Sequence, residues 1–158
     1  MEKHIKLYVD GKGKNCNGCT RCCEGWLTTK VYDFDIGPGI GGCRFLGKNG
    51  CNIYQTRPHD PCKVFQCGWK ENTQVPEFMR PDLSNVILLV RFIESFHFYR
   101  IVKCGDDLLP EVVKWAKDYS ELGNHLIAYD KDSNLLIFSK ERKFRELARK
   151  HYSLGGIH

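Results

Sequence analysis

The chain has 158 residues, of which 42% are hydrophobic and 12% aromatic, with nine cysteines and a formal net charge of +5. This size and composition exclude a disordered protein and favour one domain, or one domain with a small appended module. The longest apolar run, VILLV at 86–90, is too short for a membrane span, and the charged residues that follow Met1 exclude a secretory signal. We therefore expect a soluble cytoplasmic protein whose cysteines stay free as metal ligands or redox groups.

Short strands separated by cysteine-bearing loops are expected in the N-terminal half. HIKLYVD at 4–10 and WLTTKVYDF at 26–34 have the β-branched and aromatic content that is typical of strands. The loops around them contain the glycines and most of the cysteines. A loop-rich organisation of this kind is typical of metal-organised modules.

The C-terminal half has stronger periodic patterns, which predict two hairpins and two helices in the order ββαββα. Pro110 favours a helix start, Gly123 favours its end, and KDSN at 131–134 predicts a hairpin turn. The expected elements are, in chain order, strands over 85–93 and 96–103, a helix over 110–123, strands over 125–130 and 135–139, and a helix over 140–152. The predicted fold class is therefore α+β, a loop-rich cysteine metal-binding module followed by antiparallel hairpins with two helices.

The distribution of cysteines predicts how the chain is divided. Eight of the nine lie between Cys16 and Cys67, and the turn-rich stretch NTQVPEFMRPD at 72–82 follows them. We therefore place a cysteine-rich metal-binding module at 1–75 and an α+β part at 76–158. The two parts are expected to pack together as one compact unit.

The stretch CNGCTRCC at 16–23 has the spacing of a metal knuckle. Cys16, Cys19 and Cys22 form C-x2-C-x2-C, the spacing with which bacterial ferredoxins bind three irons of a four-iron cluster. A single zinc ion suits three sulfurs from one short loop less well. Cys23 is adjacent to Cys22, and adjacent side chains tend to diverge, so we expect the two to serve different sites or different irons.

A second group of cysteines lies at wider spacings, so two metal sites can be formed. Its members are Cys43, Cys51, Cys62 and Cys67. We predict that the three knuckle cysteines share one centre with Cys62 or Cys67 as a distant fourth ligand. Cys23, Cys43 and Cys51 would then complete a second site or support the first.

These residues resemble the YkgJ-type cysteine-cluster family, which is described as a zinc- or iron-chelating domain with a CxxCxxCC signature. CNGCTRCC matches the signature, and CRFLGKNGCNIYQTRPHDPCKVFQC is similar to the family's second block. The resemblance covers about 16–90. Between the blocks, family members often carry a longer, partly helical insert, where this chain has only EGWLTTKVYDFDIGPGIGG. The resemblance implies metal binding and leaves the metal open, while related cysteine-rich methylases, thought to hold an iron–sulfur cluster, favour iron.

We predict from these patterns a metal-binding protein that holds iron, with a 4Fe–4S iron–sulfur cluster favoured and zinc as the alternative. Its role would be electron transfer, cluster delivery or redox sensing, with a redox or cluster-acceptor protein as partner. The chain contains no recognisable hydrolytic triad and no paired carboxylates in a site motif, so we do not expect catalysis without the metal.

A zinc-organised structural or interaction module is the competing hypothesis. Arg142, Arg145 and Arg149 recur at helical spacing in the terminal helix and would contact nucleic acid in that hypothesis. An ordinary solvated helix face with i,i+4 ion pairs is the simpler interpretation. Cys104 is expected to be an ordinary buried or free thiol, and His59 a solvated loop residue rather than a ligand.

Overall fold

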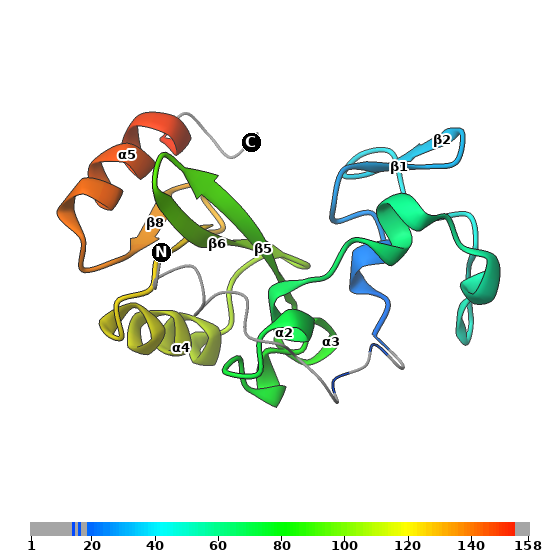
Figure 1. The fold of residues 1–158 in the computed structure, drawn as a ribbon, viewed down its shortest axis with the longest axis horizontal. Coiled ribbons are helices and arrows are strands. Elements are labelled where there is room, and N and C mark those ends of the chain that lie inside the picture. The colour runs from blue at the N-terminus through cyan, green and yellow to red at the C-terminus, as the bar shows by residue number, and fades with distance from the viewer. Residues whose placement is uncertain (1–13, 15, 17–18, 154–158) are drawn as a thin grey trace.

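A computed structural model describes residues 14, 16 and 19–153 of the chain. Figure 1 shows two parts, a β-sheet flanked by helices and a smaller part built of short hairpins and turns. The strand expected at 4–10 lies outside the described residues.

The larger part is a four-stranded sheet in the order β5, β6, β7, β8. β5 and β6 pair antiparallel through a two-residue turn in which Glu94 takes a φ of 48°, and β7 and β8 pair antiparallel as well. The two predicted hairpins and the α+β fold class are confirmed. The strands are β5 (Val86–Ile93), β6 (Phe96–Lys103), β7 (Leu126–Tyr129) and β8 (Leu135–Phe138).

The two hairpins are joined by a parallel pair, so the sheet is mixed. Tyr99 in β6 is opposite Leu126 in β7 in parallel register. Parallel neighbours need a crossover connection, and α4 (Pro110–Glu121) provides it. Gly123 follows α4 with a φ of 95°, as expected for the glycine that ends a helix.

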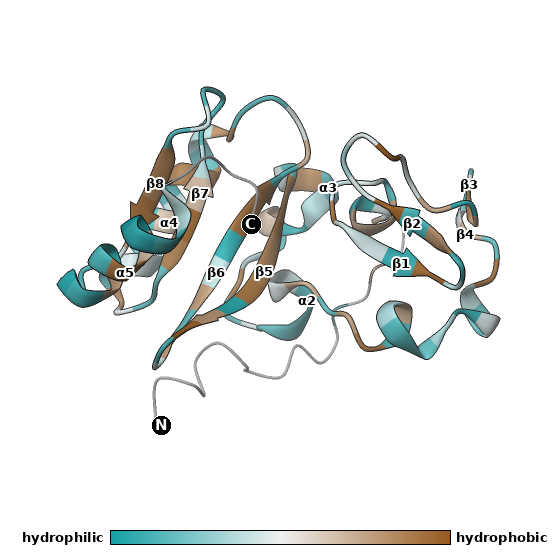
Figure 2. Cartoon of the chain, turned by 90° about the horizontal axis from the view of Figure 1, so that it is seen from above, coloured by the Kyte–Doolittle hydropathy of each residue, from teal (hydrophilic) through white to brown (hydrophobic). Residues whose placement is uncertain are grey.

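Helices cover both faces of the sheet. α4 packs Val112, Ala116 and Tyr119 against one face, while α5 (Arg142–Tyr152) packs Phe144 and Ala148 against the other. Figure 2 shows how the apolar residues concentrate on the strands between these helices. Among the described residues, neither helix nor any shorter one is long and apolar enough to cross a membrane.

The smaller part contains only short elements around a small apolar cluster. Val31, Phe34 and Ile36 are its buried members. The elements are η1 (Arg21–Cys23), β1 (Thr29–Val31), β2 (Phe34–Ile36), β3 (Leu46–Gly47), β4 (Gly50–Cys51), η2 (Tyr54–Thr56) and the irregular turn η3 (His59–Lys63).

The single strand predicted over 26–34 is wrong, because this stretch turns back on itself. Val31 in β1 is directly opposite Phe34 in β2, so Tyr32 and Asp33 form a two-residue turn. Tyr32 takes a φ of 51°, a left-handed conformation that ends the strand. The result is a hairpin rather than one long strand.

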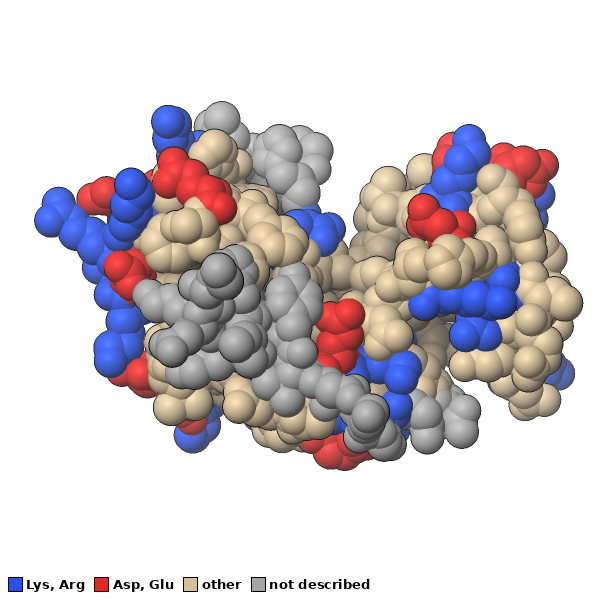
Figure 3. Space-filling model, viewed as in Figure 1, with Lys and Arg blue, Asp and Glu red and all other residues tan. Residues whose placement is uncertain are grey.

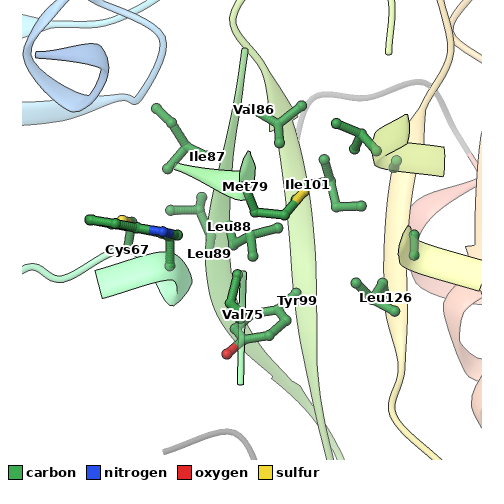
Figure 4. Close-up of a cluster of buried hydrophobic side chains, with 14 of the residues drawn as sticks. Cys67, Val75, Met79, Val86, Ile87, Leu88, Leu89, Tyr99, Ile101 and Leu126 are labelled. Atoms are coloured by element: carbon green, nitrogen blue, oxygen red, sulfur yellow. The ribbon is translucent and has the colours of Figure 1, made fainter. Parts of the chain in front are cut away.

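Three short helices connect the two parts, and the first and last of them pack beside β5. They are α2 (Gly68–Glu71), η4 (Glu77–Met79) and α3 (Pro81–Ser84). Trp69, Val75 and Met79 from this region are buried with the sheet in one cluster. Figure 4 shows Cys67 at the edge of this cluster, so a cysteine of the predicted metal module contacts the core of the sheet.

Candidate metal centre

The knuckle cysteines lie in a chain of tight turns. The Cys19 amide donates to the Cys16 carbonyl at 2.8 Å, and the Cys23 amide donates to the Thr20 carbonyl at 2.9 Å. Cys22 and Cys23 are in η1. All nine cysteines of the chain are described, and each is a free thiol.

One group of thiols combines the knuckle with a distant cysteine. Burial raises the pKa of Cys67 to about 11, and the Cys16 and Cys19 thiols contribute to this rise. The pKa of Cys22 is raised by its hydrogen bond with Cys23, by burial, and by Cys67 and Cys16 among its neighbours. These effects place Cys16, Cys19, Cys22 and Cys67 in one neighbourhood, which we call the first thiol set.

A second group consists of thiols from separate segments of the smaller part. Burial raises the pKa of Cys62, and Cys23, Cys43 and Cys51 raise it further. Burial also raises the pKa of Cys43, which has Cys23 and Cys51 as neighbours. The Cys43 amide donates to the Cys23 carbonyl at 2.8 Å, which joins two of these segments directly. We call Cys23, Cys43, Cys51 and Cys62 the second thiol set.

The adjacent cysteines of η1 mark the border between the two sets. The Cys22 thiol donates a hydrogen bond to the Cys23 sulfur, which lowers the pKa of Cys23 to about 7. Cys22 packs against the cluster that contains the sheet, whereas Cys43 and Cys62 pack against the small cluster of the other part. This arrangement supports the expectation that the two neighbours serve different sites.

Backbone amides approach three of the eight thiols in pairs. Each of these hydrogen bonds favours the thiolate over the thiol. Cys19 accepts from the amides of Arg21 and Asp82, Cys43 from those of Phe45 and Leu46, and Cys67 from those of Trp69 and Lys70. Amides that donate to sulfur are the usual outer support of thiolate metal ligands, so the donor chemistry of both sets fits a metal that prefers thiolate.

The thiols of each set are neighbours, but they are not arranged as a complete coordination shell around a metal ion. Across residues 14, 16 and 19–153, no three Cys, His, Asp or Glu side chains are grouped closely enough to hold a metal ion. Both sets would therefore have to contract around a bound ion or cluster.

Close backbone packing holds η1 against the loop that carries Cys43. A Cβ on Gly25 would lie 2.8 Å from the Gly41 carbonyl carbon, and one on Gly42 would lie 3.0 Å from the Cys23 carbonyl oxygen. Gly25 also takes a φ of 99°, which glycine adopts without strain. Glycines at these positions let the two backbones meet, and this contact places Cys23 beside Cys43.

A polar network fixes the knuckle to the start of β5. Glu24 accepts hydrogen bonds from Arg21 at 2.8 Å, Thr20 at 2.7 Å and the Trp26 indole at 3.2 Å. These bonds outweigh the effect of burial and lower the pKa of the Glu24 carboxyl. Arg21 also donates to the Asn85 side chain at 2.8 Å, so the knuckle and the sheet share one network.

Cys104 lies near the knuckle, although its sequence position predicts only an ordinary buried or free thiol. Its amide donates to the Asn85 carbonyl at 2.7 Å, and burial raises the pKa of its thiol to about 12, with Arg21, Glu24 and Cys19 among its ionisable neighbours. No local motif indicates this position. The strand pairing does so, because Val86 is opposite Lys103 and brings the next residue beside the end of α3.

The other residues considered near the cysteines are accounted for by loop structure. His59 is exposed at the start of η3. Arg57 donates to the Tyr54 carbonyl and stacks 3.8 Å from the centre of its ring, so it anchors the turn before Pro58. Arg57 also lowers the pKa of Cys62, although burial and the neighbouring thiols outweigh it.

A scan against protein-family models matches no family, and searches of curated proteins and of solved structures match no relative and no structure.

Proposed function

We propose that this chain is a metal-binding protein of the YkgJ type that holds iron as a 4Fe–4S cluster through the first thiol set. The observation that carries the proposal is the neighbourhood of Cys67 with the knuckle thiols. Three closely spaced cysteines and one distant cysteine are the ligand pattern of four-iron clusters, whose separate irons accept sulfurs from one short loop. The amides at Cys19 and Cys67 support it further, since hydrogen bonds to sulfur tune such clusters.

The second thiol set would form a separate thiolate centre. Its sulfurs come from four separate segments of the chain, and four thiolates are one of the ligand sets of a closed tetrahedral zinc site. We propose zinc as the alternative metal, and the second thiol set suits zinc better than the first set does. In that case the ion would organise the smaller part of the structure around its few buried apolar side chains.

The first set is placed suitably for exchange with a partner protein. Cys16 is exposed, whereas Cys67 is buried beside the core, so a cluster there would have one accessible edge and one protected edge. We propose electron transfer, cluster delivery or redox sensing as the role, with a redox or cluster-acceptor protein as partner. The proposed compartment is the cytoplasm, whose reducing conditions would keep all nine thiols free.

The basic terminal helix supports nucleic-acid binding less well than the cysteines support metal binding. Figure 3 shows Lys and Arg side chains around the end of the molecule that carries α5. Arg142 pairs with Glu146 at 3.0 Å, and Arg145 donates to the Ser139 carbonyl at 3.0 Å. Two of the three candidate arginines therefore have partners within the chain. We assign no catalytic reaction to the protein.

The metal content of anaerobically purified protein tests the proposal. We expect a brown protein with visible absorption and about four irons and four acid-labile sulfides per chain. Cys16→Ser and Cys19→Ser should both abolish the colour, and Lys131→Met, at an exposed position remote from the cysteines in the sequence, should retain it. Colourless protein with zinc alone would refute the iron proposal and leave the zinc alternative. Unchanged iron in both cysteine variants would refute the role of the knuckle.

A further inference from the structure

Lys14 attaches the chain just before the knuckle to the segment that follows Cys67. Its Nζ donates hydrogen bonds to the backbone carbonyls of Trp69 at 2.7 Å, Asn72 at 2.7 Å and Val75 at 2.6 Å. An ammonium group has three protons, so these three bonds use all of them. The same Nζ lies 5.0 Å from the centre of the Trp69 ring, which adds a cation–π contact.

A second lysine completes this attachment from the opposite direction. The carbonyls that Lys14 contacts lie in α2 and the turn that follows it, where a helix leaves its last carbonyls without intrahelical partners. Lys70 in α2 donates from its Nζ to the Lys14 carbonyl at 2.9 Å. We call the two reciprocal contacts the lysine clamp.

Both ends of the lysine clamp lie next to cysteines of the first thiol set. Lys14 precedes Cys16 by two residues, and Cys67 is the residue directly before α2. Lys14 and Trp69 are 55 residues apart in the chain. Closing a loop of that length has an entropic cost, which the contacts of the clamp offset before any metal is bound.

We propose that Lys14 is a positioning residue that holds the knuckle against Cys67 and thereby sets the metal affinity of the first thiol set. This inference rests on the proposed function, and it gives Lys14 no bond to the metal. Lys14 acts through the carbonyls of Trp69, Asn72 and Val75, because its hydrogen bonds to them fix the separation of the two segments that supply the ligands. A lysine that only stabilised the fold would affect both thiol sets alike.

Co²⁺ binding to the metal-free full-length protein separates these two roles. The thiolate–cobalt absorption would be titrated against a competing chelator in Lys14→Met, Lys14→Arg and the exposed control Lys131→Met, with Cys67→Ser and Cys51→Ser assigning the signals to the sets. We expect Lys14→Met to lower the Co²⁺ affinity of the first thiol set by about 10- to 100-fold, the usual effect of losing an outer support of a metal site. The Co²⁺ affinity of the second thiol set should be unchanged in Lys14→Met, and both affinities should be unchanged in Lys131→Met. Lys14→Arg should keep most of the affinity of the first set. Equal affinities in all variants, or equal weakening of both sets, would overturn the proposal.

A measurement without metal distinguishes failure of this inference from failure of the proposed function. A short bifunctional thiol reagent should link Cys16 to Cys67 in the metal-free wild-type protein, and mass spectrometry of the linked peptides gives the yield. Lys14→Met and Lys70→Met should both lower that yield, since each breaks one direction of the lysine clamp. If the yield falls but the wild-type protein binds neither Co²⁺ nor iron, the positioning role stands and the proposed function fails. An unchanged yield in both variants would show that Lys14 does not position the knuckle.

Discussion

The thiols of Cys22 and Cys23 share a hydrogen bond, and most of their other thiol neighbours lie in different thiol sets. Cys22 has Cys16 and Cys67 as neighbours, whereas Cys23 affects the pKa of Cys43 and Cys62 and, across the border, that of Cys16. The vicinal pair is therefore a junction between two candidate centres. A junction of this kind makes the assignment of ligands experimentally accessible, because one substitution on each side should affect one centre.

Substituting one distant cysteine from each set should remove different metals. We expect Cys67→Ser to remove the metal of the first thiol set and Cys51→Ser that of the second. Because the sets do not share these ligands, the losses should add in the double variant. Iron and zinc analysis with the visible spectrum measures both losses. One shared centre would instead appear as the loss of the same metal in both single variants.

The pH dependence of alkylation should reveal the lowered pKa of Cys23. The thiolate of Cys23 is the nucleophile, so in metal-free protein its reaction with iodoacetamide should accelerate as the pH rises through about 7. An ordinary thiol has a pKa of 9.0 and should accelerate only at higher pH. Cys22→Ala removes the hydrogen-bond donor, so the midpoint should move up towards 9.0. Peptide mass spectrometry over a pH series measures it.

Cys43 serves as the internal control for this experiment. Burial raises the pKa of its thiol, so its alkylation should accelerate only at higher pH in both proteins. A midpoint for Cys23 that is the same with and without the Cys22 thiol would contradict the hydrogen bond as its cause.

Gly68 should not tolerate a side chain, although it lies in a helix. A Cβ there would be 2.6 Å from Tyr99 Cε1 and 2.8 Å from Leu88 Cβ, so Gly68→Ala should destabilise the fold by about 1–3 kcal/mol through overpacking. Gly105→Ala is the matched control, because a Cβ at that position meets nothing within 4 Å. Urea unfolding of both variants measures the difference, and equal stability would contradict the close packing of α2 on the sheet.

Asn72 links three segments inside the core and should be sensitive to truncation. It is fully buried, and its side-chain amide donates to the hydroxyls of Tyr99 at 3.1 Å and Tyr119 at 3.2 Å. Its side-chain oxygen accepts from the Gln74 amide at 2.9 Å. Asn72→Ala removes these bonds from a buried site, so we expect a loss of about 1–3 kcal/mol in the free energy of unfolding.

Gln74→Ala provides the comparison for Asn72, since the Gln74 side chain is exposed and the change keeps its backbone amide. It should alter stability by less than about 0.5 kcal/mol. Chemical denaturation followed by circular dichroism measures both variants. Similar losses in the two variants would contradict the structural role of the Asn72 side chain.

The elements of the C-terminal half could be predicted because their signals are local. Alternating apolar residues over 85–103, Pro110 at a helix start and Gly123 after its end each act within a few residues. The hairpin at 29–36 was missed because it depends on Tyr32 adopting a left-handed conformation, for which tyrosine has no preference. The parallel pairing of β6 with β7 was also missed, since strand order depends on contacts between distant segments.

The composition of the candidate site could be predicted better than its arrangement. The spacing from Cys16 to Cys23 indicates a metal knuckle, whereas spacing alone does not choose between Cys62 and Cys67 as the fourth ligand. The structure brings Cys67 to the knuckle because α2 packs beside β5, a contact that no spacing reveals. The position of Cys104 likewise depends on the register of β5 and β6.

Apolar burial is distributed unevenly along the chain. The whole composition is sufficient for a core, but within 19–66 the only buried hydrophobic side chains are Val31, Phe34 and Ile36. Three such side chains are far fewer than an independent domain requires. The smaller part would then gain its rigidity from cross-linking by metal, so it would be firm when loaded and pliable when empty, while the sheet keeps its shape. Such a metal-dependent change in rigidity would alter the surface of the smaller part when a centre is filled or emptied, and a partner protein could recognise that difference.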